Sequence, residues 1–565
     1  MFNKNTNNLE WENIMEELRS LFLTPKEDNK EILVRDIQTI LSQIPNDNPD
    51  NPYIGKLGDT HEFLDKFEKI PLNPGSQDSI LSGIANIFSG AFKFQHPQVM
   101  HNVTPSPIVN SVAAAAVSHL YNLNPAWDFI SAGAQKMERQ VIKQLASYVG
   151  WKEKAAGIST YGGKGCITYA IRIGLNRCLS NVSAKGISRN ALPPIVITSK
   201  SNHQSIDTAC SLLGIGYENC WRSEVNDDET MEIESFKRLI KKAVSEGYPI
   251  AAIILSGGNT LHLSIDDLRE VSVYLAEMVK EYKLEYKPYI YFDTCVAWPW
   301  IFFIDYNFEE NSLNLPSKTL EIIKNSTLQI SAITLADGCG FDFHKTGNNP
   351  YATSIFLTKN EAELNTAFKN LSGPFNVKAQ GNNFLYHCTI EHSRTATGIL
   401  AAWTSLQSMG LNGYRSYIGH LITIGCEVRH ILPDYGMELL NPFSLAPASV
   451  FFPFPKGFTS SYWDLINADK EIIEKFNIRT FQLFKYFQDK NANHKSSFIF
   501  RFIPQYRQAK CGISIAVLVI YPMSVFLTQQ SMKELLHVIG GIKNSFDQTN
   551  KYEITNNSIP TYVPR

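Results

Sequence analysis

Alternating strand-like and helical segments are the feature that most limits the fold of this chain. Apolar runs typical of buried strands lie at 195–199, 250–255, 289–292, 328–335 and 354–357. Helical patterns lie between the first three of these runs, at 205–213, 235–245 and 266–282, and the last of these begins with a capping aspartate. This alternation predicts βαβ units and a mostly parallel sheet. Because ligands bind beyond the carboxyl ends of the strands in such sheets, functional residues are expected there.

The length of 565 residues is too great for one hydrophobic core, so several domains are expected. Residues 1–95 are polar and contain two helical patterns, at 9–22 and 30–44, with little apolar material for a core of their own. We predict an N-terminal helical segment at 1–95, a large α/β domain at 96–415 and a smaller α+β domain at 416–565.

Composition excludes several classes of function. The formal net charge of −2 gives no field that would attract nucleic acid or an anionic membrane. The nine cysteines form no Cys-x-x-Cys pair, which argues against a disulfide framework or a zinc site, so no metal is expected. The N-terminus lacks an apolar segment behind a basic start, and the most apolar run, 513–527, is too short to span a membrane. A cytoplasmic protein is therefore expected.

The stretch 336–351 places Lys345 directly after His344, between the predicted strands 328–335 and 353–358. A lysine held in an apolar wall is costly to keep charged, so its pKa is expected to fall and its neutral amine to attack a carbonyl. That is the chemistry of a Schiff-base lysine. A His-Lys pair alone is also common in ordinary loops, so the neighbouring motifs decide its meaning.

A glycine-rich turn precedes the helical pattern at 167–179. It reads Gly162-Gly163-Lys164-Gly165. Glycines at this place let backbone N–H groups close on a phosphate, and the helix dipole favours the negative charge. A plain glycine turn remains the alternative.

Three polar residues follow predicted strands. His203 comes after the strand at 195–199, and could be an ordinary surface group. Asp293 ends a strongly apolar strand, where a carboxylate is costly unless it is paired, so it belongs to an ion pair or to a functional site. Thr260 follows the preceding predicted strand, at 250–255, and could instead be part of a helix-entry turn.

These motifs, in this order and followed by His344-Lys345, resemble the pyridoxal-phosphate-dependent group II amino-acid decarboxylases of fold type I. The resemblance covers about residues 95–415 and continues more faintly to 518–527. It implies a large domain with a mostly parallel seven-stranded sheet flanked by helices, an N-terminal helical segment and a small α+β C-terminal domain. It also implies a homodimer in which the N-terminal helices are exchanged between subunits.

The resemblance further implies roles for single residues. Lys345 would bind pyridoxal 5'-phosphate as a Schiff base, Asp293 would pair with the pyridinium nitrogen, and His203 would stack on the ring and steer its orientation. Cys295 stands where the family has a small residue against the ring, and Thr260 would approach the phenolic oxygen or the substrate carboxylate. The expected phosphate contacts are Gly163, Lys164 and His344.

Contacts to the amino-acid substrate are predicted from the same resemblance. The loop 102–105 is similar to a segment that lines the substrate pocket, so Asn102 and Thr104 are candidates, with Thr104 a possible carboxylate contact. Arg394 matches an arginine that follows a mobile loop, and could anchor the active-site wall or form a structural ion pair. Many relatives carry a protonating tyrosine on that loop; here 371–385 has none, and Tyr386 is the nearest tyrosine.

The sequence leaves three functions open. The favoured one is decarboxylation of an L-amino acid to an amine and CO2. The second is a carbon-carbon lyase or an aldehyde-forming enzyme, because Lys345-Thr-Gly resembles the sphingosine-phosphate-lyase type and the loop tyrosine is missing. The third is a catalytically silent scaffold, suggested by Lys164 and Cys166 where the family's glycine loop has other residues. Which amino acid is the substrate stays open.

Overall fold

The structure is a computed structural model that describes residues 10–46, 48–126, 128–151, 153–187, 191–368, 389–455, 461–493 and 498–549. The chain divides into two compact units. One consists of Met1–Val99 with Phe487–Ile499, and the other of Met100–Tyr486 with Phe500–Arg565. The domain boundaries at 95 and 415 stay predictions. Tyr386 and the segment 371–385 lie outside the described residues.

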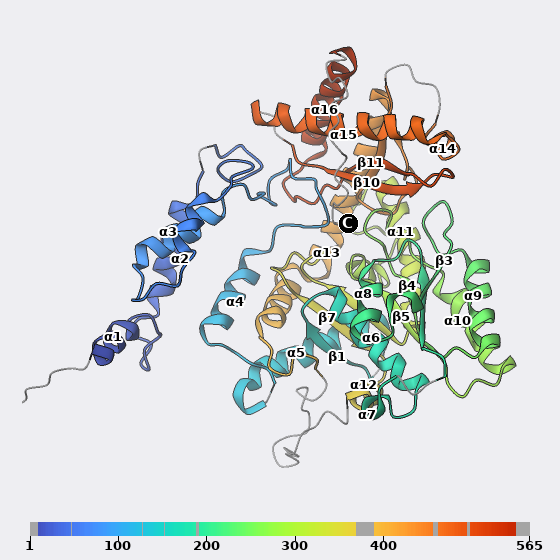
Figure 1. The fold of residues 1–565 in the computed structure, drawn as a ribbon, viewed down its shortest axis with the longest axis horizontal. Helices are drawn as coiled ribbons and strands as arrows, with labels where there is room; N and C mark the ends of the chain where they lie inside the picture. The colour runs from blue at the N-terminus through green and yellow to red at the C-terminus, as the bar shows by residue number, and fades with distance from the viewer. Residues whose placement is uncertain are drawn as a thin grey trace, which may run out of the picture. The chain divides into compact units, whose positions relative to one another are not determined.

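A seven-stranded sheet forms the centre of the second unit (Figure 1). Its strand order is β1-β7-β6-β5-β4-β2-β3. β7 runs antiparallel to β1 and β6, whereas all other neighbours are parallel. The strands are β1 (Ala156–Thr160), β2 (Ile195–Ser199), β3 (Cys220–Ser223), β4 (Ile250–Ser256), β5 (Tyr289–Asp293), β6 (Gly338–Asp342) and β7 (Ser354–Thr358). The predicted mostly parallel α/β fold is confirmed.

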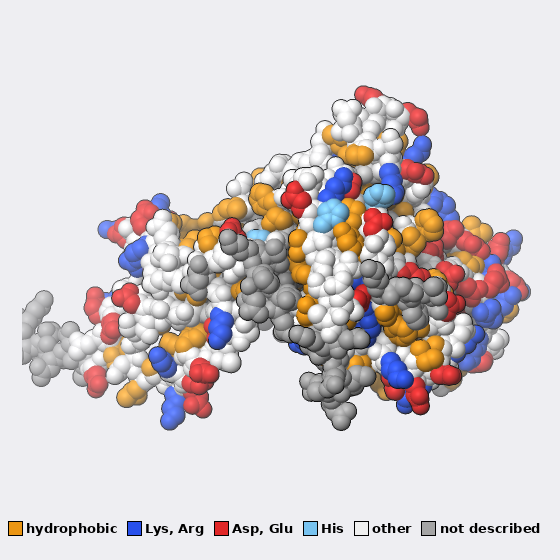
Figure 2. Space-filling view, turned by 90° about the horizontal axis from the view of Figure 1, so that it is seen from above, with side chains coloured by type: hydrophobic (Ala, Val, Ile, Leu, Met, Phe, Trp, Pro, Cys, Tyr) orange, Lys and Arg blue, Asp and Glu red, His pale blue; other side chains and the backbone are white. Residues whose placement is uncertain are grey.

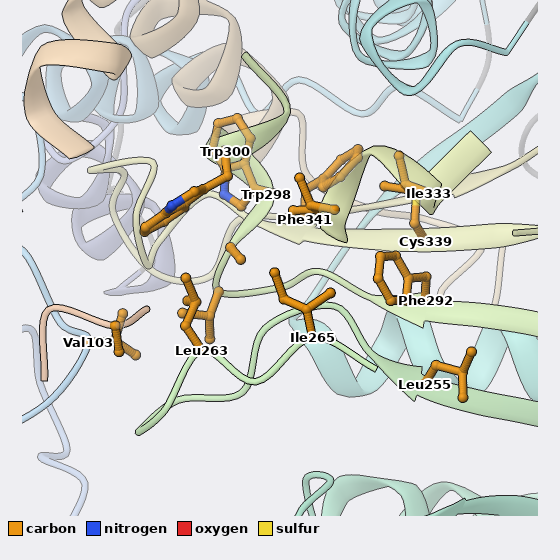
Figure 3. Close-up of a cluster of buried hydrophobic side chains, with 14 of the residues drawn as sticks. Val103, Leu255, Leu263, Ile265, Phe292, Trp298, Trp300, Ile333, Cys339 and Phe341 are labelled. Carbon is orange, nitrogen blue, oxygen red and sulfur yellow. The ribbon is translucent and has the colours of Figure 1, made fainter. Parts of the chain in front are cut away.

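Helices cover both faces of this sheet, and each face has its own hydrophobic core. One core joins the sheet to α6 (Gly163–Cys178), α7 (Val182–Lys185), α8 (Ser205–Leu212) and α12 (Glu361–Phe368). The other joins it to α5 (Asp128–Val149), α9 (Ile233–Glu246), α10 (Leu268–Glu281), α11 (Ser317–Ile330) and α13 (Thr397–Ile431). Figure 3 shows part of the second core, where Leu255 and Phe292 on the strands approach Ile265 and Phe341. Strands buried on both faces explain the continuous apolar runs at 195–199 and 250–255.

The predicted strand at 328–335 is wrong. These residues are the end of α11 and a 3-10 helix, Ser331–Leu335. Ile330 and Ile333 are buried whereas Leu328 and Leu335 are exposed, which is a helical rather than an alternating pattern. The strand is β6 instead, and its two glycines interrupt the apolar run that would have indicated a strand in the sequence. Side chains at Gly338 and Gly340 would collide with the hydroxyls of Tyr289 and Tyr291, at 2.3 Å and 2.1 Å.

A second, antiparallel sheet has the order β10-β11-β9-β8. Its strands are β8 (Met437–Leu439), β9 (Ser449–Pro453), β10 (Arg501–Gln508) and β11 (Ser514–Ile520). The helices in this part of the chain are α14 (Tyr462–Leu465), α15 (Lys470–Asn493) and α16 (Gln529–Thr549). The predicted small α+β element is thereby confirmed, although the sequence did not predict β10.

The N-terminal unit has little core. Its helices are α1 (Glu10–Arg19), α2 (Glu31–Gln43) and α3 (Gln77–Ile87), and neither α1 nor α2 has a buried residue. Trp11, Phe22 and Leu41 are 60%, 67% and 64% exposed. Figure 2 shows apolar side chains between charged ones on this part of the surface. The other unit also has exposed apolar side chains, on α4 (Val109–Leu120), where Val109 and Val117 are exposed.

The described residues contain neither a membrane-spanning helix nor a metal-binding cluster. None of their helices has an apolar stretch long enough to cross a membrane. They also contain no cluster of three or more His, Cys, Asp or Glu side chains that could hold a metal ion. The cysteines within these ranges are free thiols.

Candidate active site

The predicted functional residues meet at one edge of the large sheet. Because β1, β2, β5 and β6 point the same way, their carboxyl ends lie together. Gly163 follows β1, His203 follows β2, Asp293 ends β5, and Lys345 comes three residues after the end of β6. The amino end of β7, which runs in the opposite direction, adds Ser354 to the same edge.

The glycine turn between β1 and α6 allows other groups to approach its backbone closely. Gly162 has a φ of +146°, which side-chain-bearing residues rarely adopt, and α6 begins at Gly163. A Cβ atom at Gly163 would lie 3.0 Å from both Asp342 Oδ2 and Cys295 Sγ. Since the first turn of a helix leaves backbone N–H groups free and carries partial positive charge, the start of α6 can bind an anion. Lys164 is exposed beside this turn.

Lys345 forms an ion pair with Asp342. Its Nζ lies 3.0 Å from Asp342 Oδ2, and the two side chains are 21% and 3% exposed. Burial alone would lower the pKa of Lys345, but Asp342 and the charge of Asp293 raise it above its ordinary value. The expectation that this pKa falls is therefore wrong. That expectation counted only apolar neighbours, whereas two carboxylates surround the lysine.

His203 and Asp293 lie close enough to Lys345 to interact with it electrostatically. Surrounding protein atoms and then the Lys345 charge lower the pKa of His203, although solvent still reaches this residue. Its Nδ1 accepts a hydrogen bond of 3.0 Å from the Ser205 backbone N–H, which leaves Nε2 for the proton. Asp293 is partly exposed, and its Oδ1 accepts a hydrogen bond of 3.2 Å from the Cys295 backbone N–H.

The turn after β6 holds Lys345 in place. The Thr346 hydroxyl donates a hydrogen bond of 2.6 Å to the Val296 carbonyl. A side chain at Gly347 would meet Trp298 at 2.8 Å, so this glycine has a packing role. His344 Nδ1 lies 3.0 Å from the Thr353 carbonyl oxygen and Nε2 lies 3.8 Å from Asp342 Oδ2, so His344 adjoins the same carboxylate as Lys345.

The predicted substrate contacts have less support from geometry and stay predictions. Asn102 accepts a hydrogen bond from its neighbour Val103, and Thr104 bonds back to the Asn102 carbonyl. Thr260 lies in the loop after β4 and is partly exposed. Arg394 is 6% exposed, and both of its terminal nitrogens lie 2.6 Å from the oxygens of fully buried Glu138. The guanidinium is thus engaged in an ion pair.

Two residues of this region escaped sequence reasoning. Asp342 lies within the motif around Lys345, and its place three residues before the lysine, at a strand end, was the available signal. Tyr521 follows β11 and is 1% exposed, and its hydroxyl has no hydrogen-bond partner among the described residues. Burial raises the pKa of Tyr521, and the charge of Lys345 acts in the opposite direction. No sequence pattern connects Tyr521 with Lys345.

The chain is similar to amino-acid decarboxylases along most of its length. An L-2,4-diaminobutyrate decarboxylase of Acinetobacter baumannii is 22% identical over 419 residues, which are 70% of this chain and 74% of that protein. An aromatic-L-amino-acid decarboxylase of Bacillus atrophaeus is 24% identical over 428 residues, 74% of this chain and 80% of that protein. In sequence, the chain is therefore similar to amino-acid decarboxylases of more than one substrate class. No protein-family model matches it.

The chain is also similar to a carbon-carbon lyase and to several solved structures. A sphingosine-1-phosphate lyase of Oryza sativa subsp. japonica is 25% identical over 325 residues, which are 56% of this chain and 52% of that protein. Among solved structures, mouse CSAD has the same fold, with a TM-score of 0.72 at 15% identity, covering 91% of this chain and 98% of that one. Oryza sativa TDC with PLP has a TM-score of 0.70 at 11% identity, covering 93% and 99%.

Proposed function

We propose that this protein decarboxylates an L-amino acid to the corresponding amine and CO2, using pyridoxal 5'-phosphate bound to Lys345. The observation that carries the proposal is a single buried cluster. In it, Lys345 and the start of α6 share one neighbour, Asp342, which is 3.0 Å from the lysine nitrogen and in contact with Gly163. A lysine nucleophile and an anion site therefore lie close together, as a phosphorylated aldehyde requires.

The residues at this sheet edge fit the cofactor. The start of α6 with Gly163 and Lys164 offers backbone N–H groups and a positive charge to the phosphate, and His344 lies nearby. Asp293 offers a carboxylate to the ring nitrogen and His203 an imidazole to the ring face. The unpartnered hydroxyl of Tyr521 is a buried donor whose partner a bound molecule could supply. When bound, pyridoxal phosphate supplies an electron sink for the electron pair that departing CO2 leaves behind.

The protonation states and charges of three residues of this chain suit them to this chemistry. Lys345 is protonated beside Asp342, so it must give up a proton before its nitrogen can act as a nucleophile. His203 has a lowered pKa and is neutral at pH 7, so it can face an aromatic ring without adding a positive charge. The negative charge of Asp293 favours a protonated ring nitrogen, which strengthens electron withdrawal.

Product analysis tests this function. The protein supplied with pyridoxal phosphate is incubated with a panel of acidic, basic, aromatic and small aliphatic L-amino acids, and CO2, amine and aldehyde are measured for each. We expect at least one amino acid to give CO2 and amine in equal amounts. An aldehyde product would instead support the lyase or aldehyde-forming alternative, and no product from any member would contradict the proposal. The packing of Gly347 on Trp298 already explains the glycine that suggested the lyase.

We also propose that the active form is a homodimer in the cytoplasm, with no nucleic acid or membrane partner. Exposed apolar side chains on α1, α2 and α4 support a subunit interface, because surfaces of this kind are usually covered. Free thiols and the small net charge support the location and the absence of those partners. Sedimentation should give about twice the chain mass of 63.7 kDa. A chain lacking residues 1–95 should sediment as a monomer; if it is an active dimer, the role of this segment is refuted.

A further inference from the structure

The carboxylate of Asp342 connects the two parts of the candidate site. Its Oδ2 lies 3.0 Å from Lys345 Nζ and 3.8 Å from His344 Nε2, and its Oδ1 accepts a hydrogen bond of 2.5 Å from the Ser354 hydroxyl. The side chain is 3% exposed. Burial alone would raise the pKa of Asp342, but Lys345 and His344 hold it below its ordinary value. Asp342 is therefore ionised at neutral pH.

The same carboxylate stands beside the start of α6. Both of its oxygens lie within 3.3 Å of the position that a Cβ atom would take at Gly163. A negative side chain at a helix N-terminus is favourable, so Asp342 already uses part of this anion-binding potential. A phosphate bound at the same helix start would therefore meet a second negative charge, and like charges at close range disfavour each other's ionised form.

The titratable groups around Asp342 come from several elements. They are Lys345, His344 and Tyr351 after β6, Cys295 after β5, Cys166 on α6 and His203 after β2. Burial lowers the pKa of both histidines, so both are neutral at pH 7. Among these six groups, Lys345 is then the one that balances the charge of Asp342.

We propose that Asp342 is a positioning residue that stores Lys345 as an ion pair and takes up a proton when the phosphorylated cofactor binds. This inference rests on the proposed function. The lysine ammonium and the aldehyde form a carbon–nitrogen double bond and release one water, and one ammonium hydrogen stays on the nitrogen. The condensation itself thus leaves the number of bound protons unchanged. Asp342 meanwhile gains a phosphate neighbour, while the lysine nitrogen keeps its positive charge.

The sign of the pH dependence follows from the added negative charge. A phosphate beside Asp342 raises the pKa of this carboxyl in the complex above its depressed value in the cofactor-free protein. A group with a higher pKa in the complex binds a proton as the complex forms, so affinity falls as the pH rises. The fall ends once Asp342 is ionised in both forms.

The test compares wild type with Asp342→Asn, which keeps the shape and the oxygen that Ser354 bonds. Both proteins are freed of cofactor and titrated with pyridoxal phosphate from roughly pH 6 to 9, with binding followed by fluorescence and visible absorbance. We expect Asp342→Asn to bind about tenfold more tightly at the alkaline end and to show a flatter pH profile. A variant that binds no more tightly, or that keeps the wild-type profile, overturns the proposal.

Matched variants separate this role from a structural one. Asp337→Asn removes the same charge next to the opposite end of β6, where Asp337 pairs with Arg177, and should bind the cofactor as wild type does. Asp342→Glu keeps the charge and should restore the pH profile. If Asp342→Asn does not fold, calorimetry at about pH 8, where the phosphate is already a dianion, should still show net proton uptake in buffers of different ionisation enthalpy, both in wild type and in Asp293→Asn, which removes the carboxylate that favours a protonated ring nitrogen. Absence of uptake overturns the proposal.

Failure of this inference differs from failure of the proposed function. If pyridoxal phosphate gives wild type no visible band that depends on Lys345, the cofactor assignment itself is wrong. If the band forms and Asp342→Asn matches wild type at every pH, the function stands and only the role of Asp342 is refuted.

Discussion

Replacement of Lys345 by alanine is expected to abolish both the visible absorbance of the protein with pyridoxal phosphate and its decarboxylation of any amino acid. The band depends on a covalent bond to the lysine nitrogen, which an alanine side chain cannot form. Loss of a covalent catalytic group lowers turnover by several orders of magnitude, and we expect at least roughly 10³-fold here. Absorbance spectra and single-turnover CO2 release measure the two effects.

Lys164→Ala is the matched control, because it removes a lysine of the same charge from the same site. Lys164 lies exposed on the first turn of α6 and is expected to contact only the phosphate. Its variant should bind the cofactor more weakly but keep the absorbance band at saturation. A band that persists in Lys345→Ala, or disappears in Lys164→Ala at saturating cofactor, would show that the nucleophile has been assigned to the wrong lysine.

The edge of the sheet that holds the candidate site could be predicted from sequence, because the hydrophobicity of a buried strand is visible in its own residues. Strands such as β2 and β4, buried on both faces, leave continuous apolar runs, and parallel connections then bring their carboxyl ends together. This placed His203 and Asp293 at one edge, whereas Lys345 was assigned next to a strand, 328–335, that is helical in the structure. β6 escaped prediction because its glycines make room for tyrosines of the neighbouring strand, a requirement that only the assembled sheet reveals.

The electrostatic state of the site could not be predicted in the same way. The pKa of Lys345 depends on which charges surround it, and the sequence gives the number of carboxylates but not their distances. Asp342 lay in the right motif, yet its 3.0 Å contact follows from the turn after β6. Tyr521 directly follows β11 of the other sheet, and its missing hydrogen-bond partner among the described residues is a property of tertiary packing.

Replacement of Arg394 by methionine is expected to destabilise the protein by about 3–5 kcal/mol, because it leaves the carboxylate of Glu138 buried without its cation. Glu138 is fully buried, and its Oε1 also accepts a hydrogen bond of 2.8 Å from the Ser159 backbone N–H. The Arg394 guanidinium donates to the Ser159 carbonyl at 3.1 Å. The pair therefore fastens the segment before α13 to α5 and β1. Guanidinium unfolding of the intact chain measures the loss.

Two comparisons decide whether Arg394 acts on the fold or on the substrate. Lys324→Met breaks an exposed pair with Glu309, with side chains 48% and 88% exposed, and should cost less than about 1 kcal/mol. Removing both buried charges, in Arg394→Met with Glu138→Leu, should recover much of the lost stability, since no unpaired charge then remains. A substrate contact would behave differently: Arg394→Met would raise KM while the unfolding midpoint stayed near that of wild type, and the double variant would not recover activity. Because β1 leads directly into the glycine turn of α6, a structural role instead predicts weaker cofactor binding together with the lost stability.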